Sequence, residues 1–142
     1  TVLTPGPTGQ AAPPTPAASP AAVVAAVIPS IYIAPAYSYA SNYDAGQCTW
    51  YVAGRRRVPS NWGNADTWYS SAERAGWHVS STTPVLGAIA QTSAGWYGHV
   101  AIVEAISPDG KSVEVTEMNY DGPYIIDNRW APTSSFRYIY EP

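Results

Sequence analysis

The spacing of apolar residues changes along the chain and separates a helical part from a strand-forming part. Before Gly76, one stretch has apolar residues three or four positions apart, which predicts a helix. These residues are Ala65, Trp68, Ala72 and Ala75. Asn64 stands where its side chain can cap this helix, and Gly76 stands where glycine commonly ends one.

An earlier helix is predicted to begin at Cys48. Gly46 and small polar neighbours form a turn signal before it, and an apolar run from Trp50 to Ala53 follows. Three arginines, residues 55–57, come at its C-terminal end, where positive charge complements the helix dipole.

After Gly76, short runs rich in β-branched and aromatic residues alternate with turn residues, which predicts strands. The runs cover residues 77–79, 85–90, 99–106, 112–118, 124–130 and 136–140. The turn signal Pro108-Asp109-Gly110-Lys111 predicts that the third and fourth runs form an antiparallel hairpin. The fold class expected is α+β, with N-terminal helices packed on an antiparallel, partly curled sheet of five or six strands.

The first part of the chain has a different composition. Residues 1–43 contain no charged side chain, and eight of the fourteen prolines precede Ala36. Repeated proline with Ala, Thr and Ser is typical of an extended spacer that buries no core. We therefore expect a linker and lead-in over residues 1–42 and one domain over residues 43–142.

Charge and cysteine content exclude several classes of function. A formal net charge of −3 argues against a nucleic-acid or anionic-membrane partner. The most apolar run, residues 21–28, stops at Pro29, which is too short for a membrane span. A single cysteine, Cys48, cannot form an intramolecular disulfide, so its thiol is free or functional.

Cys48 is the candidate nucleophile. At the first turn of a helix it lies near unpaired backbone N–H groups and the positive end of the dipole, which favours the thiolate. That effect alone is too weak, so a histidine partner is expected. In the predicted hairpin the start of the third run lies opposite the end of the fourth, which brings His99 near Glu117 or Asn119.

These residues form the set that a cysteine hydrolase requires, with His99 as the base. Glu117 is chosen as the third member because a carboxylate both orients the imidazole and favours its charged form. Asn119 is the next candidate, as an orienting contact or on the substrate side. The backbone N–H of Cys48 and the side chain or backbone of Gln47 are the expected oxyanion donors.

Aromatic residues flank the candidate site. Trp62, Trp96, Tyr97 and Tyr120 lie next to the segments above, and tyrosine and tryptophan keep a polar tip at wet surfaces. They are candidates for lining a substrate groove.

Cys48 and His99 also have simpler interpretations. A lone cysteine is often an inert buried thiol, and a histidine that opens a strand is often structural. His78, just past a predicted helix end, is interpreted as structural or exposed. A zinc site of Cys48, His78, His99 and Glu117 has suitable ligands, yet its spacing matches no compact zinc pattern.

At these positions the chain resembles the CHAP domains, the cysteine- and histidine-dependent amidohydrolases/peptidases, whose arrangement is papain-like. The matching segments appear in family order over nearly all of residues 43–140. They are Gly46-Gln47-Cys48-Thr49-Trp50-Tyr51-Val52, Trp62-Gly63-Asn64-Ala65, Val85-Leu86-Gly87-Ala88-Ile89, Gly98-His99-Val100-Ala101-Ile102-Val103-Glu104 and Val115-Thr116-Glu117-Met118-Asn119-Tyr120.

The resemblance implies hydrolysis of amide bonds in the peptide part of bacterial peptidoglycan, as an N-acetylmuramoyl-L-alanine amidase or an endopeptidase. Cys48 would be the nucleophile and His99 the base, with Glu117 and Asn119 completing the site. The alternatives are a non-catalytic cell-wall binding or scaffolding module, and an amidase that acts on a small non-wall amide.

The resemblance also implies a secreted or cell-wall-associated location, bacterial or phage-borne, and further domains in a longer parent chain. Some phage members carry an Asp-rich calcium loop before the nucleophile. This chain has only Asn42 and Asp44 there, so we expect no required metal and no cofactor.

Overall fold

The structure, a computed structural model, describes residues 43–142. The predicted linker and lead-in, residues 1–42, lie outside the described residues, and the domain boundary at Tyr43 stays a prediction.

Two short helices open the described part of the chain. The helix α2 (Cys48–Arg55) begins at the predicted residue, and α3 (Trp68–Arg74) follows a 3-10 turn, η1 (Ala65–Thr67). The predicted cap at Asn64 is wrong, since its side chain makes no capping hydrogen bond. Its backbone carbonyl instead accepts the N–H of Thr67 at 3.0 Å, a bond that tightens this turn to 3-10 geometry.

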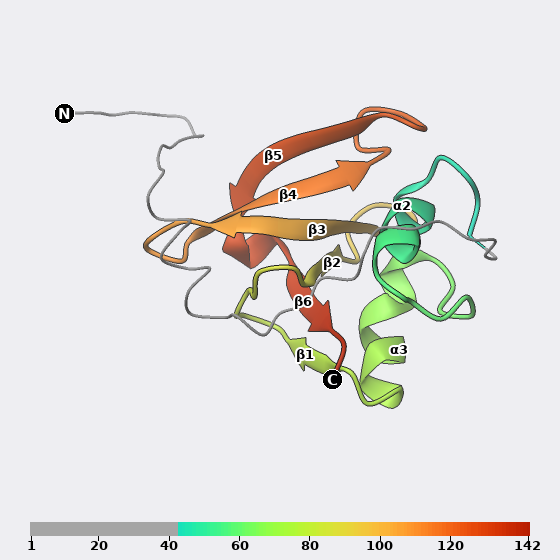
Figure 1. The fold of residues 1–142 in the computed structure, drawn as a ribbon, viewed down its shortest axis with the longest axis horizontal. Helices are drawn as coiled ribbons and strands as arrows, with labels where there is room; N and C mark the ends of the chain where they lie inside the picture. The colour runs from blue at the N-terminus through green and yellow to red at the C-terminus, as the bar shows by residue number, and fades with distance from the viewer. Residues whose placement is uncertain (1–42) are drawn as a thin grey trace.

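The strands form one antiparallel sheet of six, in the order β1-β6-β2-β3-β4-β5 (Figure 1). They are β1 (His78–Ser80), β2 (Ile89–Thr92), β3 (His99–Ile106), β4 (Ser112–Met118), β5 (Ile126–Pro132) and β6 (Arg137–Tyr140), with a 3-10 turn, η2 (Thr133–Ser135), before the last. The α+β class, the strand number and the hairpin of β3 with β4 are confirmed.

Two features of the sheet differ from the predictions. The run at residues 85–90 enters the sheet only from Ile89, and the run at 124–130 does so from Ile126. The last strand, β6, lies between β1 and β2, so the order of the strands departs from their order in the sequence.

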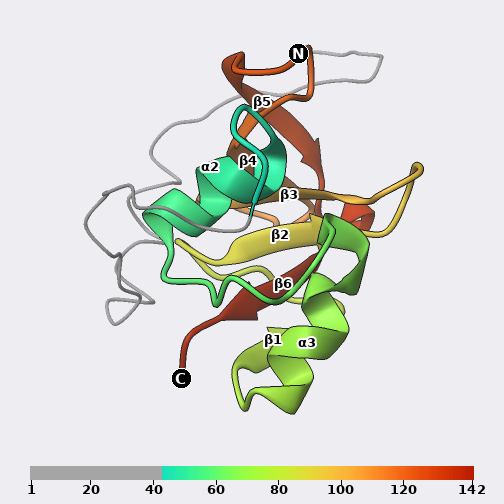
Figure 2. The same ribbon diagram turned by 90° about the vertical axis from the view of Figure 1, so that its right-hand side faces the viewer.

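Apolar side chains pack on both faces of the sheet. On one face, α2 and α3 contribute Val52 and the fully buried Trp68 to a cluster that includes Ile102. On the other, Val103 and Val115 pack with a second cluster around the buried Tyr138. Figure 2 shows that both helices lie on the same side of the sheet, and in Figure 1 α2 lies beside the end where β3 begins and β4 ends.

A β-bulge at Glu104 interrupts the hairpin of β3 and β4. Nearer the turn, Ala105 pairs with Glu114, whereas beyond the bulge Val103 pairs with Val115, so the register moves by one residue. Opposed residues in an antiparallel pair share a face. If the register near the turn continued along the whole hairpin, Glu117 would lie opposite Ile102, on the helix-covered face. Because the bulge shifts the register by one residue, Glu117 lies on the face of His99.

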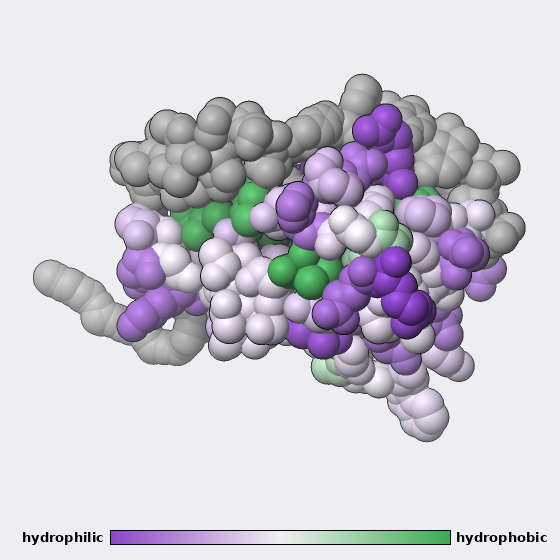
Figure 3. Space-filling model, turned by 90° about the horizontal axis from the view of Figure 1, so that it is seen from below, coloured by the Kyte–Doolittle hydropathy of each residue, from purple (hydrophilic) through white to green (hydrophobic). Residues whose placement is uncertain are grey.

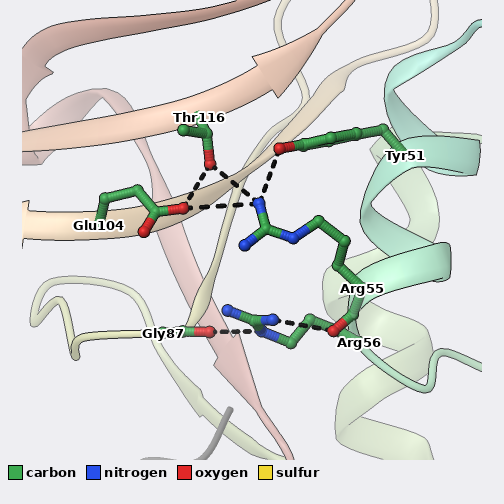
Figure 4. A network of polar contacts seen from close by, with 6 residues as sticks. All are labelled: Tyr51, Arg55, Arg56, Gly87, Glu104 and Thr116. Atoms are coloured by element: carbon green, nitrogen blue, oxygen red, sulfur yellow. Dashed lines mark hydrogen bonds and ion pairs between the residues drawn. The ribbon is translucent and has the colours of Figure 1, made fainter. Parts of the chain in front are cut away.

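Polar contacts hold the bulge residue against the first helix (Figure 4). Glu104 Oε2 accepts a hydrogen bond from the hydroxyl of Thr116 at 2.6 Å and lies 3.6 Å from Nη1 of Arg55 on α2. Arg55 also donates to the hydroxyl of Tyr51 at 2.7 Å, and Arg56 donates to the carbonyl of Gly87 at 2.9 Å. The contacts of Glu104 join α2 to β3 and β4, and the bond of Arg56 joins the end of α2 to the segment before β2.

The face shown in Figure 3 is mostly polar, with apolar residues in small separate patches. Among residues 43–142, no helix has both the length and the apolar character that crossing a bilayer requires.

Candidate active site

The candidate nucleophile lies at the first residue of α2. Gln47 precedes it in an extended conformation, and Gly46 has a φ of 87°. A Cβ on Gly46 would lie 2.7 Å from the ring of Tyr124, so glycine is required for this close approach as well as for its backbone angle. Cys48 is buried and its thiol is free.

The segment before His99 is pressed against η1. Gly98 has a φ of 77°, and a Cβ there would lie 2.6 Å from the backbone N of Asp66 and 2.7 Å from the carbonyl of Thr92. The N–H of Asp66 donates to the carbonyl of Tyr97 at 2.9 Å. Only glycine allows this packing, which fixes where β3 begins and therefore where the imidazole stands.

The imidazole and the candidate carboxylate are in contact. Nε2 of His99 lies 2.8 Å from Oε1 of Glu117, whose side chain is completely buried. The thiol of Cys48 lies near enough to this imidazole to raise its pKa. Because Nε2 is occupied by Glu117, Nδ1 is the ring nitrogen left for the sulfur. The three side chains predicted to meet are therefore brought together.

The charges of this group reinforce one another. Burial lowers the pKa of His99, but the hydrogen bonds to Cys48 and Glu117 outweigh it and raise that pKa from 6.5 to about 9. Burial opposes the carboxylate of Glu117, and its bonds to His99 and Arg129 overcome this, so the pKa of Glu117 is lowered. The pair is therefore imidazolium and carboxylate at neutral pH.

Two residues near Glu117 were missed by the sequence interpretation. Arg129 on β5 donates from Nε to Oε2 of Glu117 at 2.6 Å, and Asp127 pairs with Glu117 across the strands. The sequence offered one signal for them: they lie two positions apart within a predicted strand, and therefore on the same face of it. The pattern named no partner, because pairing of β5 with β4 is a tertiary feature.

Asn119 contacts Gln47, the residue before the cysteine. It follows β4 with a φ of 67°, and its Nδ2 donates to Oε1 of Gln47 at 2.6 Å. Its backbone N–H donates to the carbonyl of Ile125 at 3.0 Å. Asn119 thus orients Gln47, the candidate oxyanion donor that precedes the cysteine.

The aromatic candidates divide into two groups. Trp96, Tyr97 and Tyr120 are 92%, 66% and 54% exposed, and the ring of Tyr120 lies 6.0 Å from that of His99. Trp62 is only 5% exposed and packs against Trp77 at 4.9 Å between ring centroids. The proposal of Trp62 as a groove residue is therefore corrected, since a buried indole offers a substrate almost no surface.

His78 takes no part in this site. It lies on β1 at the opposite edge of the sheet from β5 and stacks on Tyr140, with 5.0 Å between the ring centroids. Within residues 43–142, no three His, Cys, Asp or Glu side chains are grouped as a metal site needs.

A cysteine at the start of a helix, facing a histidine on an antiparallel sheet, defines the papain-like class of α+β fold. Within that class the chain belongs to the CHAP domain family, whose model matches residues 38–119.

Two similar proteins come from staphylococci. The chain is 50% identical over 90 residues to the staphylococcal secretory antigen ssaA2 of Staphylococcus aureus, covering 61% of this chain and 33% of that protein. It is 39% identical over 112 residues to the N-acetylmuramoyl-L-alanine amidase sle1 of Staphylococcus haemolyticus, covering 75% of this chain and 33% of that one.

A solved structure also matches. The crystal structure of an N-acetylmuramoyl-L-alanine amidase from Staphylococcus aureus superposes with a TM-score of 0.68 at 31% identity, over 77% of this chain and 34% of that chain. The chain thus spans about a third of the length of these relatives.

Proposed function

We propose that this domain hydrolyses amide bonds in the peptide part of bacterial peptidoglycan, with Cys48 as a thiol nucleophile. The observation that carries the proposal is the 2.8 Å contact of His99 with Glu117, on an imidazole whose pKa Cys48 also raises. The names of two relatives, both N-acetylmuramoyl-L-alanine amidases, support the substrate class.

The reaction is an acyl transfer in two stages. The thiolate of Cys48 attacks the carbonyl carbon, and a C–S bond forms as the carbonyl π electrons move to oxygen. The N–H of Cys48 and the amide of Gln47 stabilise that oxyanion. The imidazolium of His99 gives its Nδ1 proton to the amine as the C–N bond breaks.

The second stage regenerates the enzyme. Nδ1 of His99 takes a proton from water, and the hydroxide oxygen attacks the acyl carbon. The C–S bond then breaks, which releases the carboxylic acid and restores the thiolate. Throughout, Glu117 holds Nε2 and stabilises the charged ring, so the exchanged proton is always the one on Nδ1.

The exposed aromatic residues are the proposed substrate surface. Trp96 and Tyr97 lie in the segment before β3, and Tyr120 lies in the segment after β4. Both segments are at the end of the hairpin where His99 lies. Their rings offer apolar area with polar tips, which suits a peptide stem that carries sugar at one end. The proposed location, secreted or at the cell wall, follows from this substrate and from the secretory antigen among the relatives.

Digestion of purified peptidoglycan tests the proposal. The wild type and Cys48→Ala are incubated with it, and the fragments are analysed by mass. We expect fragments with new amine and carboxyl ends from the wild type alone, and their masses identify an amidase or an endopeptidase. Identical release by both proteins excludes the thiol mechanism. Absence of release by both, with retained binding to the wall, would indicate a binding module instead.

A further inference from the structure

Arg129 is a charged residue of this site to which the CHAP resemblance assigns no role. Its Nε donates to Oε2 of Glu117 at 2.6 Å, and its Nη2 donates to Oε1 at 3.3 Å. Both carboxylate oxygens are thus held by one planar fork. Glu117 is completely buried, so an arginine that pairs with it determines how that carboxylate lies against His99.

The same guanidinium supports a second neighbour of the imidazole. Its central carbon lies 3.9 Å from the ring centroid of Tyr120, which is a close cation–π contact. Tyr120 in turn lies 6.0 Å from the ring of His99. Arg129 therefore contacts two neighbours of His99. Its N–H groups bond Glu117, and its central carbon lies over the ring of Tyr120.

A second carboxylate makes the charge of Arg129 important. Asp127 pairs with Glu117 across β4 and β5, and its Oδ1 is buried with no hydrogen-bond partner in the described part of the chain. Burial first, and then the neighbouring Glu117, raise the pKa of Asp127 to about 6. Two adjacent carboxylates compete for one proton, and the guanidinium lies on the side of Glu117.

We propose that Arg129 is a positioning residue, which fixes the carboxylate of Glu117 on His99 and keeps it ionised beside the second carboxylate, Asp127. This inference rests on the proposed function only for the role of Glu117 toward His99. The charged groups that face Glu117 are His99 from β3 and Arg129 and Asp127 from β5; Asp121, in the segment after β4, acts on Asp127.

Titration of Glu117 tests the inference without any substrate. Carboxyl carbon resonances are followed by NMR in the wild type and in Arg129→Met. Loss of the cation is expected to raise the titration midpoint of Glu117 by about one pH unit or more. Adding Asp127→Asn to Arg129→Met is expected to bring the midpoint back down, because the competing carboxylate is gone.

A conservative variant separates charge from geometry. Arg129→Lys keeps the positive charge but not the fork, so the midpoint of Glu117 should stay close to the wild-type value. Turnover at neutral pH should fall about tenfold, because a single ammonium fixes the carboxylate less well. In Arg129→Met, protonation of Glu117 should add a loss of turnover on the acid side, with a midpoint that follows the Glu117 midpoint.

Arg137→Met is the matched control. Arg137 also lies 3.9 Å from a tyrosine ring, that of Tyr69, and donates to Oε1 of Gln91, but Glu117 is not among its partners. Its removal should leave the Glu117 midpoint unchanged.

The inference is overturned by an unchanged Glu117 midpoint in folded Arg129→Met, or by full turnover in Arg129→Lys. Should Arg129→Met fail to fold, Arg129→Lys decides. Failure of peptidoglycan cleavage would leave the titration result standing.

Discussion

At the scale of single residues, the site is a chain of polar side chains, each in contact with the next. The sulfur of Cys48 meets an imidazole, the imidazole meets Glu117, and Glu117 meets Arg129. A fully buried carboxylate is costly unless each oxygen has a partner, and here both are bonded. The arrangement is therefore stable only as a group, and removal of one member should affect the next.

Glu117→Gln tests this coupling. The amide can still accept a hydrogen bond from His99, but the negative charge that favours imidazolium is lost. We expect turnover to fall by about 100-fold and the basic limb of activity to move to lower pH. Steady-state rates measured from pH 5 to 10 would show both effects.

Glu104→Gln is the control for that variant. Glu104 is also a carboxylate of the β3–β4 hairpin, but it bonds Thr116 and Arg55 and not His99. Its pH profile should match that of the wild type. A wild-type basic limb in Glu117→Gln would contradict the role of Glu117.

At the scale of elements, two glycines and one bulge position the site. Gly46 lets Tyr124 lie against the turn before α2, and Gly98 lets β3 begin against η1. Each has a positive φ and a neighbour too close for a Cβ. The sequence showed both glycines beside the motifs, but only the packing shows why no other residue fits.

Gly98→Ala should be strongly destabilising. Its methyl group would meet backbone atoms of Asp66 and Thr92, which cannot rotate away, in addition to the strain of a positive φ. We expect a loss of about 2 to 4 kcal/mol in the free energy of unfolding, measured by urea denaturation, and lower activity in the folded fraction.

Gly110→Ala separates the two causes. Gly110 has a φ of 75° in the hairpin turn, and a Cβ there would have nothing within 4 Å. Its substitution should cost only the backbone strain, about 1 kcal/mol. If the two variants are equally destabilised, close packing at Gly98 is not the reason for its glycine.

Part of the fold and of the site could be predicted from the sequence. The helix start at Cys48 and the hairpin were predictable, because capping signals, turn residues and alternation are local. The pairing of β5 with β4 and the insertion of β6 between β1 and β2 depend on contacts between distant segments. Arg129 could not be assigned from the sequence for this reason, and Trp62 was misassigned because burial is decided by packing.

At the scale of the whole molecule, activity should follow a bell-shaped dependence on pH. The pKa of His99 is raised to about 9, so the imidazolium that protonates the leaving amine persists below that value and is lost above it. Turnover should therefore fall as pH rises through about 9. The limbs belong to the coupled thiol–imidazole pair, and rates over this range would show them.

We expect the reaction to need no metal. Activity in excess chelator should equal activity in untreated samples, because the proposed steps use only thiolate, imidazole and backbone or amide donors. A loss of rate that added calcium restores would contradict this expectation.

The domain boundary gives a further prediction. A chain cut to residues 43–142 should fold and release the same peptidoglycan fragments as the full chain, because the described helices, sheet and site lie within it. Circular dichroism and fragment masses would test this, with Cys48→Ala in the same background as the inactive control. Loss of folding in the shorter chain would place part of the core before Tyr43.

The bulge at Glu104 has a consequence for comparing this domain with its relatives. A relative with the same number of residues between its histidine and its glutamate, but with regular pairing, would turn the glutamate toward the helices and leave the histidine alone. A relative one residue shorter at this point could make the equivalent strand pairs without a bulge, and both side chains would stay on one face. Whether a relative has an intact acid–base pair therefore depends on the spacing and the bulge together, as well as on which residues they are.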